Sequence, residues 1–504
     1  MSSTYFNPQG LAGILCSRAG VFTLIGRGNE ALSDLDRALD LAQGFKDVRS
    51  KRRMKLDCLL KKSEVFHLQG RYSEMKEGAE AALEAAVADG DRKTEADSLN
   101  LNGRAHFRLG EYDRALDYYQ RALAIRKKIG DRQGEGRSLT SLGGIHHSLG
   151  EYQKALGFYQ RSLAISRETG DRQGEPPTLF NIGLIHHSLG SISEALDTFR
   201  RCLESARDIG DRRIEARALE AIAGMHQGLG EYERALDCYR RCLTLLHEIG
   251  DRQGEASALF NLGGAYHNLG DYDRAMDCSQ RTLAIAREIG DRLLEASTLE
   301  TLGMVYHILG DLDQALDHYR RSLTLLEDLG VRQKVAGGLF NLGEVLSDSG
   351  ALRESEAYYQ KGEALSREFG FKYWWAGCAA GLASLYLGQG KVGLAEEKIA
   401  QLQALLEGFD SPYYCGIGLN LLGRLHAQRG EAGPAKKAFQ EAITIFKDLQ
   451  EELLIGTTCF YFGQGLQALG EPREGEWYLV QANEIFAKLK AKGWLKRLER
   501  VLRP

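Results

Sequence analysis

Residues 130–170 read GDRQGEGRSLTSLGGIHHSLGEYQKALGFYQRSLAISRETG, and the same pattern returns along the chain at a fixed period, which is the step from Gly130 to Gly170. Its first mark is the tripeptide Gly-Asp-Arg, which keeps an unbroken register and begins at Gly90, Gly130, Gly170, Gly210, Gly250 and Gly290. A second glycine lies midway between these marks and recurs at Gly110, Gly150, Gly190, Gly230, Gly270, Gly310, Gly350, Gly390, Gly430 and Gly470. A fixed period of this length is typical of a solenoid, in which each repeat packs on its neighbours.

Each repeat is predicted to form two antiparallel α-helices, here called A and B. In residues 131–148, Leu139, Leu142 and Ile145 recur at helical spacing, and the apolar residues of 151–168 do the same. Gly130 suits the left-handed conformation just past a helix end, and the aspartate that follows it can cap the next helix. One pair cannot bury its apolar stripe alone, so neighbouring pairs must stack.

Two positions of the repeat hold small residues twelve apart, and they indicate where helices A and B meet. The first position is occupied by Gly103, Gly143, Gly183, Ala223, Gly263, Gly303, Gly343, Ala383, Gly423 and Gly463. The second is occupied by Ala115, Ala155, Ala195, Ala235, Ala275, Ala315, Ser355, Ala395, Ala435 and Gly475. Glycine costs up to about 1 kcal/mol in a helix interior, so its recurrence there predicts close helix packing.

The spacing of these residues resembles that of the tetratricopeptide repeat (TPR) family. Leu142-Gly143, His146, Ala155, Tyr159 and Ser162 stand where that family has Leu-Gly, Tyr, Ala, Phe and Ala. The repeat is longer than the family's usual length of about 34 residues and lacks the usual proline. In both respects it is similar to the longer repeats of spindle-orientation adaptors and bacterial signalling proteins. The resemblance implies an all-α, right-handed superhelical solenoid, and it is weakly specific for function.

The chain is expected to form one continuous array of about twelve repeats. The predicted solenoid covers residues 1–490, with regular repeats in 90–330 and divergent repeats in 331–490, where the Gly-Asp-Arg mark decays. Residues 491–504 are predicted to form a C-terminal capping helix, because solenoid ends need a cover with a polar outer face. Its apolar stripe is Trp494, Leu495, Leu498, Val501 and Leu502; a basic helix on a membrane surface is the alternative interpretation.

Composition favours an ordinary protein of the cytoplasm. Of the 504 residues 43% are hydrophobic and 27% charged, and the net charge of −4 gives no indication of a nucleic-acid partner. No apolar stretch predicts a membrane span, and residues 1–10 lack the features of a secretory signal. The nine cysteines are scattered and odd in number, which fits reduced thiols. No cofactor is predicted, and self-association stays open.

The candidate binding site is the face of the A helices that points away from helix B, which by resemblance to the family lines a concave groove. A line of mostly imidazole side chains comes three residues before the second glycine: His147, His187, Gln227, His267 and His307. A second line alternates Phe-Asn with Glu in successive repeats: Phe180, Asn181, Glu220, Phe260, Asn261, Glu300, Phe340 and Asn341. Such a surface suits a peptide with apolar anchors and basic or polar groups between them.

Simpler interpretations of the same residues stand beside this one. Repeats made by recent duplication share residues before selection acts on them, and some of the phenylalanines could pack between neighbouring A helices. The histidines at the family's Tyr position are expected in the core: His106, His146, His186, His226 and His426. Cys238 and Cys242, one helical turn apart, favour packing over a metal site, and nothing pairs a nucleophile with a base and an orienting carboxylate.

These observations predict a non-catalytic scaffold or adaptor that binds a protein or peptide segment in the groove. The alternative function is a sensor that resembles TPR-type peptide-pheromone receptors, in which a short peptide changes the superhelix. An adaptor holds its partner without a small ligand, whereas a sensor is compacted or stabilised by the peptide alone. A third interpretation, an enzyme that uses the histidine line, predicts a bound metal or a turnover that depends on His187 and His267.

Overall fold

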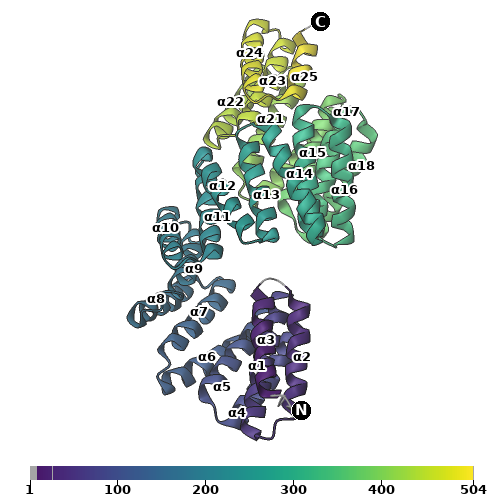
Figure 1. Ribbon diagram of the computed structural model, residues 1–504. Coiled ribbons are helices and arrows are strands. Elements are labelled where there is room, and N and C mark those ends of the chain that lie inside the picture. Colours follow the sequence, from purple (N-terminus) through teal and green to yellow (C-terminus); the bar gives the residue numbers. More distant parts are fainter. Residues whose placement is uncertain (1–7, 25–26, 503–504) are drawn as a thin grey trace. The chain divides into compact units, whose positions relative to one another are not determined.

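The computed structural model describes residues 8–24 and 27–502, which form 25 α-helices (Figure 1). Residues 1–7, 25–26 and 503–504, among them the predicted start of the first A helix and its closing Gly26, lie outside the described residues. The helices alternate as twelve A–B pairs followed by one further helix. The prediction of an all-α solenoid of twelve helix pairs is therefore confirmed. In the described parts of the chain, no helix is sufficiently long and apolar to traverse a lipid bilayer.

The A helices are α1 (Pro8–Leu24), α3 (Val48–Leu68), α5 (Arg92–Arg108), α7 (Arg132–Ser148), α9 (Glu175–Ser188), α11 (Arg212–Gly228), α13 (Arg252–Asn268), α15 (Arg292–Leu309), α17 (Arg332–Ser349), α19 (Lys372–Gly388), α21 (Pro412–Gln428) and α23 (Glu452–Ala468). The B helices are α2 (Gly28–Gln43), α4 (Tyr72–Asp89), α6 (Tyr112–Ile129), α8 (Tyr152–Thr169), α10 (Ile192–Ile209), α12 (Tyr232–Glu248), α14 (Tyr272–Ile289), α16 (Leu312–Asp328), α18 (Leu352–Phe369), α20 (Val392–Glu407), α22 (Ala432–Asp448) and α24 (Pro472–Lys488). The last helix is α25 (Lys492–Leu502).

Both glycine marks end helices in the left-handed conformation. Gly130, after α6, has φ +74°, and Gly150, after α7, has φ +75°. The amide of Gly150 donates to the carbonyl oxygen of His147 at 2.9 Å, and the next amide donates to that of His146 at 2.8 Å, which satisfies the last carbonyls of α7. In the divergent repeats Gln450 and Lys490 occupy this register and still adopt positive φ, 57° and 51°.

The aspartate of Gly-Asp-Arg caps the following A helix, as predicted. The Asp131 carboxylate accepts the Gly134 amide at 3.0 Å, and Asp291 accepts the Leu294 amide at 2.9 Å. After residue 330 the mark decays, and Val331 offers α17 no side-chain cap. Ser411 restores a cap at α21 by accepting the Tyr414 amide at 3.4 Å.

The small positions lie where helix A meets helix B of the same repeat. A Cβ added at Gly143 would stand 2.7 Å from Cε1 of Tyr159, whose ring is 2% exposed, so the ring packs directly on the glycine backbone. The same glycine–ring contact recurs at Gly103–Tyr119, Gly183–Phe199, Gly303–Tyr319, Gly343–Tyr359 and Gly423–Phe439. Ala155, at the second small position, is completely buried. The predicted contact between helices A and B is therefore confirmed.

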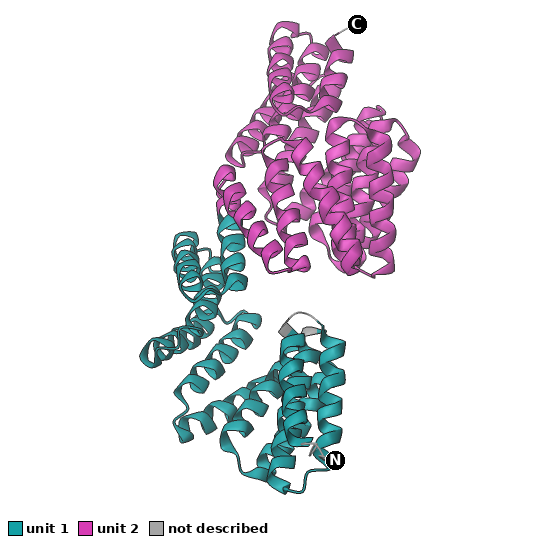
Figure 2. Cartoon of the chain, in the orientation of Figure 1, with its two compact units in different colours: residues 1–225 teal, residues 226–504 magenta. Residues whose placement is uncertain are grey.

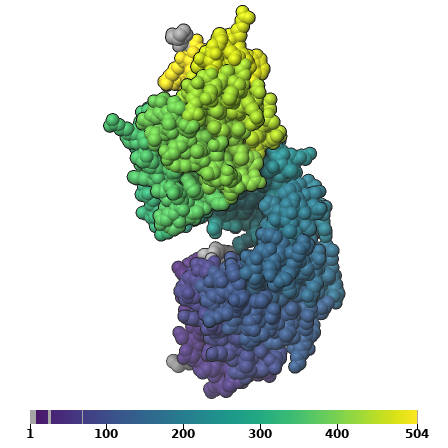
Figure 3. Space-filling model, turned by 180° about the vertical axis from the view of Figure 1, so that it is seen from behind, coloured from purple at the N-terminus to yellow at the C-terminus, as the bar shows by residue number. Residues whose placement is uncertain are grey.

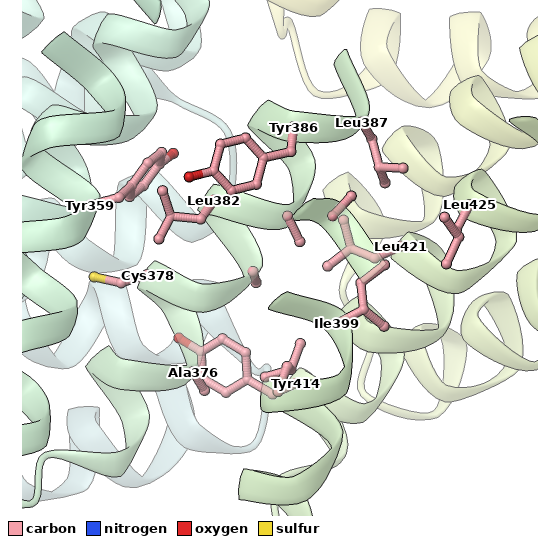
Figure 4. Packing of buried hydrophobic residues seen from close by; sticks show 14 of the residues in the cluster. Tyr359, Ala376, Cys378, Leu382, Tyr386, Leu387, Ile399, Tyr414, Leu421 and Leu425 are labelled. Atoms are coloured by element: carbon pink, nitrogen blue, oxygen red, sulfur yellow. The ribbon is translucent and has the colours of Figure 1, made fainter. Parts of the chain in front are cut away.

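Contacts between helices divide the chain into two compact units, Met1–Met225 and His226–Pro504, with the boundary inside α11 (Figure 2). In unit 2 a large apolar cluster joins α18, α19, α20 and α21, and Figure 4 shows Tyr359, Leu382, Tyr386 and Leu421 pointing into it. The green and yellow residues of this unit form a continuous surface (Figure 3).

Within each unit several A helices contact one another as well as their B helices. They contact the A helix of the next repeat, as α5 contacts α7 in unit 1 and α17 contacts α19 in unit 2. The principal partners of the B helices in the described residues are A helices. The face of the A helices that carries the predicted site is called the inner face below.

Candidate binding surface on the A helices

The predicted site residues of unit 1 lie on α7, α9 and α11. His187 is exposed and His147 is half-buried. Phe180 is 7% exposed, because its ring packs on Phe199 with centroids 5.5 Å apart and the guanidinium of Arg217 lies 4.2 Å above it. Phe180 therefore offers a partner little of its ring, whereas His147 and His187 remain accessible. Asn181 and Glu220 are half-buried.

In unit 2 the two phenylalanines of the predicted groove differ in their surroundings. Phe260 and Asn261 on α13 are half-buried. Phe340 on α17 packs against the apolar cluster of unit 2, with its ring centroid 6.0 Å from those of Tyr359 and Trp374. The aromatic residues that gather after residue 370 in the sequence thus support the core next to Phe340, which is half-buried like Phe260.

The alternation of Glu with Phe-Asn has a structural role that the sequence analysis did not foresee. Asn341 on α17 donates from Nδ2 to Oε1 of Glu300 on α15 at 3.1 Å, which links two successive A helices. Burial raises the pKa of Glu300, while the charge of Lys334 and this amide bond oppose the shift. A search for polar pairs separated by about one repeat is the sequence signal that could have found the contact.

The line of imidazoles packs against the first residue of helix B in several repeats. His147 lies 5.9 Å from the ring of Tyr152, and His267 lies 5.6 Å from that of Tyr272. Burial lowers the pKa of both histidines, and Nε2 of His267 is buried without a hydrogen-bond partner. Gln227 stands in this line where other repeats have histidine, and its Oε1 accepts the Tyr239 hydroxyl at 3.1 Å.

Most of the histidines at the family's Tyr position form a hydrogen bond with a glutamate just after the end of their helix A. His106 and His226 are buried, as predicted, with 2% and 5% exposed, while His146, His186 and His426 are half-buried. In four repeats Nδ1 meets a glutamate five residues later at 2.5–2.6 Å: His106–Glu111, His146–Glu151, His226–Glu231 and His426–Glu431. The sequence analysis predicted no role for these glutamates, although His and Glu recur five residues apart in the sequence.

The inner face of unit 2 carries carboxylates on α17, and one of them binds a cation from α25. Tyr359 donates its hydroxyl to Glu344, whose pKa is raised by burial. One turn further on, Asp348 accepts Nε2 of His307 at 2.8 Å and pairs with Arg497 of α25. Burial opposes ionisation of Asp348, but the His307 hydrogen bond and the Arg497 charge outweigh it and lower its pKa.

Among the residues that the structure describes, no three His, Cys, Asp or Glu side chains converge as metal ligands. The nine cysteines are free thiols, and the row considered in the sequence is packed in the helices: Cys202, Cys242 and Cys278 are buried and Cys238 is half-buried. Burial raises the pKa of Cys202 to about 12 and that of Cys278 to about 11.

Comparison with known proteins identifies the repeat. A model of the Tetratricopeptide repeat family matches overlapping segments that together span residues 55–368: residues 55–128, 94–168, 134–208, 175–248, 214–288, 254–328 and 294–368. A model described as Anaphase-promoting complex subunit 5 matches residues 399–460. The sequence matches no curated protein.

Solved structures share the fold at low identity. A STAND signal-transduction ATPase with a tetratricopeptide repeat sensor from Pyrococcus horikoshii aligns with TM-score 0.56 and 15% identity, over 80% of this chain and 64% of its own. The apo form of RapI aligns with TM-score 0.50 and 14% identity, over 71% and 98%. At these identities the likeness shows the fold alone. Since the family model covers more than half of the chain, this protein belongs to the tetratricopeptide repeat family.

Proposed function

We propose that the protein is an adaptor that binds a protein or peptide segment on the inner face of its A helices and catalyses no reaction. The observation that carries this proposal is that His187 is exposed and that His147 and Phe260 are only half-buried on the A helices. Half-buried aromatic and imidazole rings at successive repeats offer stacking and hydrogen bonding to an extended or helical segment.

The chemistry of the side chains supports a binding role in the cytoplasm. The raised pKa values of the buried Cys202 and Cys278 keep these thiols protonated and unreactive. Free cysteines throughout the described chain suit a reducing compartment. In unit 2, Asp348 of α17 has a lowered pKa beside Arg497, and its negative charge favours a basic group as its partner.

Affinity capture from extract of the source cell tests the proposal. The baits are the full chain, the double variant His147→Ser and His187→Ser, the single variant Phe260→Ser, and a control with Gln153→Ser and Gln160→Ser on the exposed side of α8. We expect wild type and control to retain a common partner that at least one inner-face variant loses by tenfold or more. Overlapping peptides from that partner then identify the bound segment.

Circular dichroism of each bait checks that it is folded, because loss of binding by an unfolded bait carries no information. If the folded inner-face variants capture the same partners as wild type and control, the A-helix face is not the binding surface and the proposal is wrong.

A sensor function is the second candidate, and the contact of α25 with A helices of unit 2 favours it, because a ligand that replaces this contact would move a whole helix. The archaeal neighbour is described as having its tetratricopeptide repeats as a sensor. A sensor is stabilised by its short peptide alone, whereas an adaptor shows no change until its macromolecular partner is present.

A further inference from the structure

The helix α25 makes two kinds of contact inside unit 2. Its apolar side covers the end of the array: Trp494, Leu495 and Leu498 pack on a cluster that includes Phe460 of α23 and Phe486 of α24. It also contacts α15, an A helix of a much earlier repeat. Figure 1 shows α25 beside α23, next to the end of α15. Covering the apolar side of the last helix pair requires only the contact with α23 and α24. The contact of α25 with α15 therefore needs a separate explanation.

The backbones of α15 and α25 meet at a pair of glycines. A Cβ added at Gly310, which ends α15, would stand 3.2 Å from Cα of Gly493, and one added at Gly493 would stand 3.5 Å from Cα of Gly310. Beside this contact Ile308 packs against the apolar cluster around Trp494. A Cβ at residue 493 would thus already be in van der Waals contact with the backbone at the end of α15, so we expect a longer side chain there to press against it.

An ion pair completes the contact and aligns α25 with two A helices. Asp348 of α17 binds Arg497 and accepts the His307 hydrogen bond from α15, and the three side chains are 27%, 29% and 23% exposed. The guanidinium of Arg497 also lies 4.6 Å from the centre of the Trp494 ring. Asp348 and Glu344 are two carboxylates on successive turns of one helix, so a cation from outside α17 stabilises both.

The helix α25 is basic and amphipathic, and one of its cations, Arg497, meets a carboxylate of an A helix. The helix reads KGWLKRLERVL and carries four basic side chains and one acidic one. Trp494 and Leu498 face the protein, whereas Lys492, Lys496 and Arg500 are exposed. Leu502, which was expected in the apolar stripe, is 50% exposed. The close approach of Gly493 and the charge of Arg497 are the features of α25 that meet α15 and α17, whereas Trp494 packs mainly on α23 and α24.

We propose that the inner face of α15 and α17 in unit 2 is a binding site for a basic amphipathic helix, and that α25 is the occupant that this chain itself supplies. A partner helix with a small residue and an arginine at the spacing of Gly493 and Arg497 competes with α25 for Asp348. This inference rests on the proposed function because it uses the same face of the A helices and names the class of partner.

A labelled peptide with the sequence of residues 491–504 tests the site on the full-length chain. Arg497→Ala in the chain weakens the internal occupant and leaves Asp348 intact, so we expect it to bind the peptide at least tenfold more tightly than wild type. Arg500→Ala, which removes an exposed arginine of the same helix, is the matched control and should bind as wild type does. Fluorescence anisotropy measures each affinity.

Two further measurements test whether the peptide binds through the ion pair between Arg497 and Asp348. Adding Asp348→Asn to the Arg497→Ala chain should abolish the gain, and a peptide that itself carries Arg497→Ala should lose it. Gly493→Leu, which opens the contact by steric exclusion and keeps Arg497, is the second open variant in case the first is unfolded. The inference is overturned if the peptide binds neither open variant more tightly than wild type, or if its binding is unaffected by Asp348→Asn.

The peptide experiment needs no cellular partner, so its result is independent of affinity capture. Tight peptide binding without a captured protein supports the helix-binding site on α15 and α17 but not the adaptor function. Capture that depends on the A helices, without any gain in peptide affinity, supports the adaptor and removes α25 as the internal occupant.

Discussion

At the scale of single residues, the recurrent glycine of helix A is explained by an aromatic ring sixteen residues later. The ring of Tyr159 rests on the Gly143 backbone, and a Cβ at that position would stand at 2.7 Å, closer than side chains approach each other. The glycine lowers helix propensity by up to about 1 kcal/mol, and close ring packing offsets this cost. Where the ring is absent, as at Gly263, the nearest atom is the Cβ of Cys278 at 3.2 Å.

We therefore expect Gly143→Leu to lower the free energy of unfolding of its repeat by roughly 1–3 kcal/mol through overpacking. Gly157→Leu on α8 is the control, since Gly157 is exposed and has nothing within 4 Å of an added Cβ. A helix former there should leave stability equal or slightly higher. Urea unfolding followed by circular dichroism measures both. Equal midpoints for Gly143→Leu and wild type would contradict the packing argument.

At the scale of the helix, the Gly-Asp-Arg mark joins three elements. Its glycine ends helix B, and its aspartate caps the next helix A. Its arginine pairs with its own helix A and with the end of the following helix B: Arg252 binds Glu255 at 2.6 Å and Glu288 at 2.5 Å. The geometry that places residue 288 beside residue 252 is set by the A–B packing.

Replacing one capping aspartate measures how much the cap contributes to the free energy of unfolding. We expect Asp291→Ala to cost about 1 kcal/mol, because the Leu294 amide loses its acceptor, and Asp291→Asn to cost less, because asparagine caps about as well. Hydrogen exchange at the first turn of α15 should rise in the alanine variant and stay near wild type in the asparagine variant. If the two variants exchange alike, the side chain does not serve as a cap.

At the scale of the whole molecule, stability is spread over repeats that pack on their neighbours. All four tryptophans, Trp374, Trp375, Trp477 and Trp494, lie in unit 2, so their fluorescence reports on that unit, whereas circular dichroism reports on every helix. A solenoid transmits a local loss of stability only through its nearest interfaces.

The Gly143→Leu change in unit 1 should accordingly shift the early part of the circular dichroism transition and leave the tryptophan transition within about 0.5 kcal/mol of wild type. The two probes should coincide more closely in wild type than in the variant. An equal shift in both probes would instead show that the chain unfolds as one cooperative unit.

The helix pairs, their ends and the contact between helices A and B could all be predicted from the amino-acid pattern. These features depend on neighbours within one period of the repeat: apolar spacing, left-handed glycines, aspartate caps and paired small residues. They could be predicted because the same residue types recur at the same positions in many repeats. The histidines at the family's Tyr position were also placed correctly at His106 and His226.

The exposure of each inner-face residue and the contacts between repeats became visible in the folded chain and could not be predicted from the pattern. Phe180 lies under Arg217, Asn341 reaches Glu300, and Asp348 receives Arg497 from α25. The first two contacts depend on the rotation between stacked repeats, and the third on the path of the chain over several of them. Periodicity specifies the repeat and its immediate interface, whereas contacts between distant repeats depend on the sum of many small rotations, which the sequence pattern does not encode.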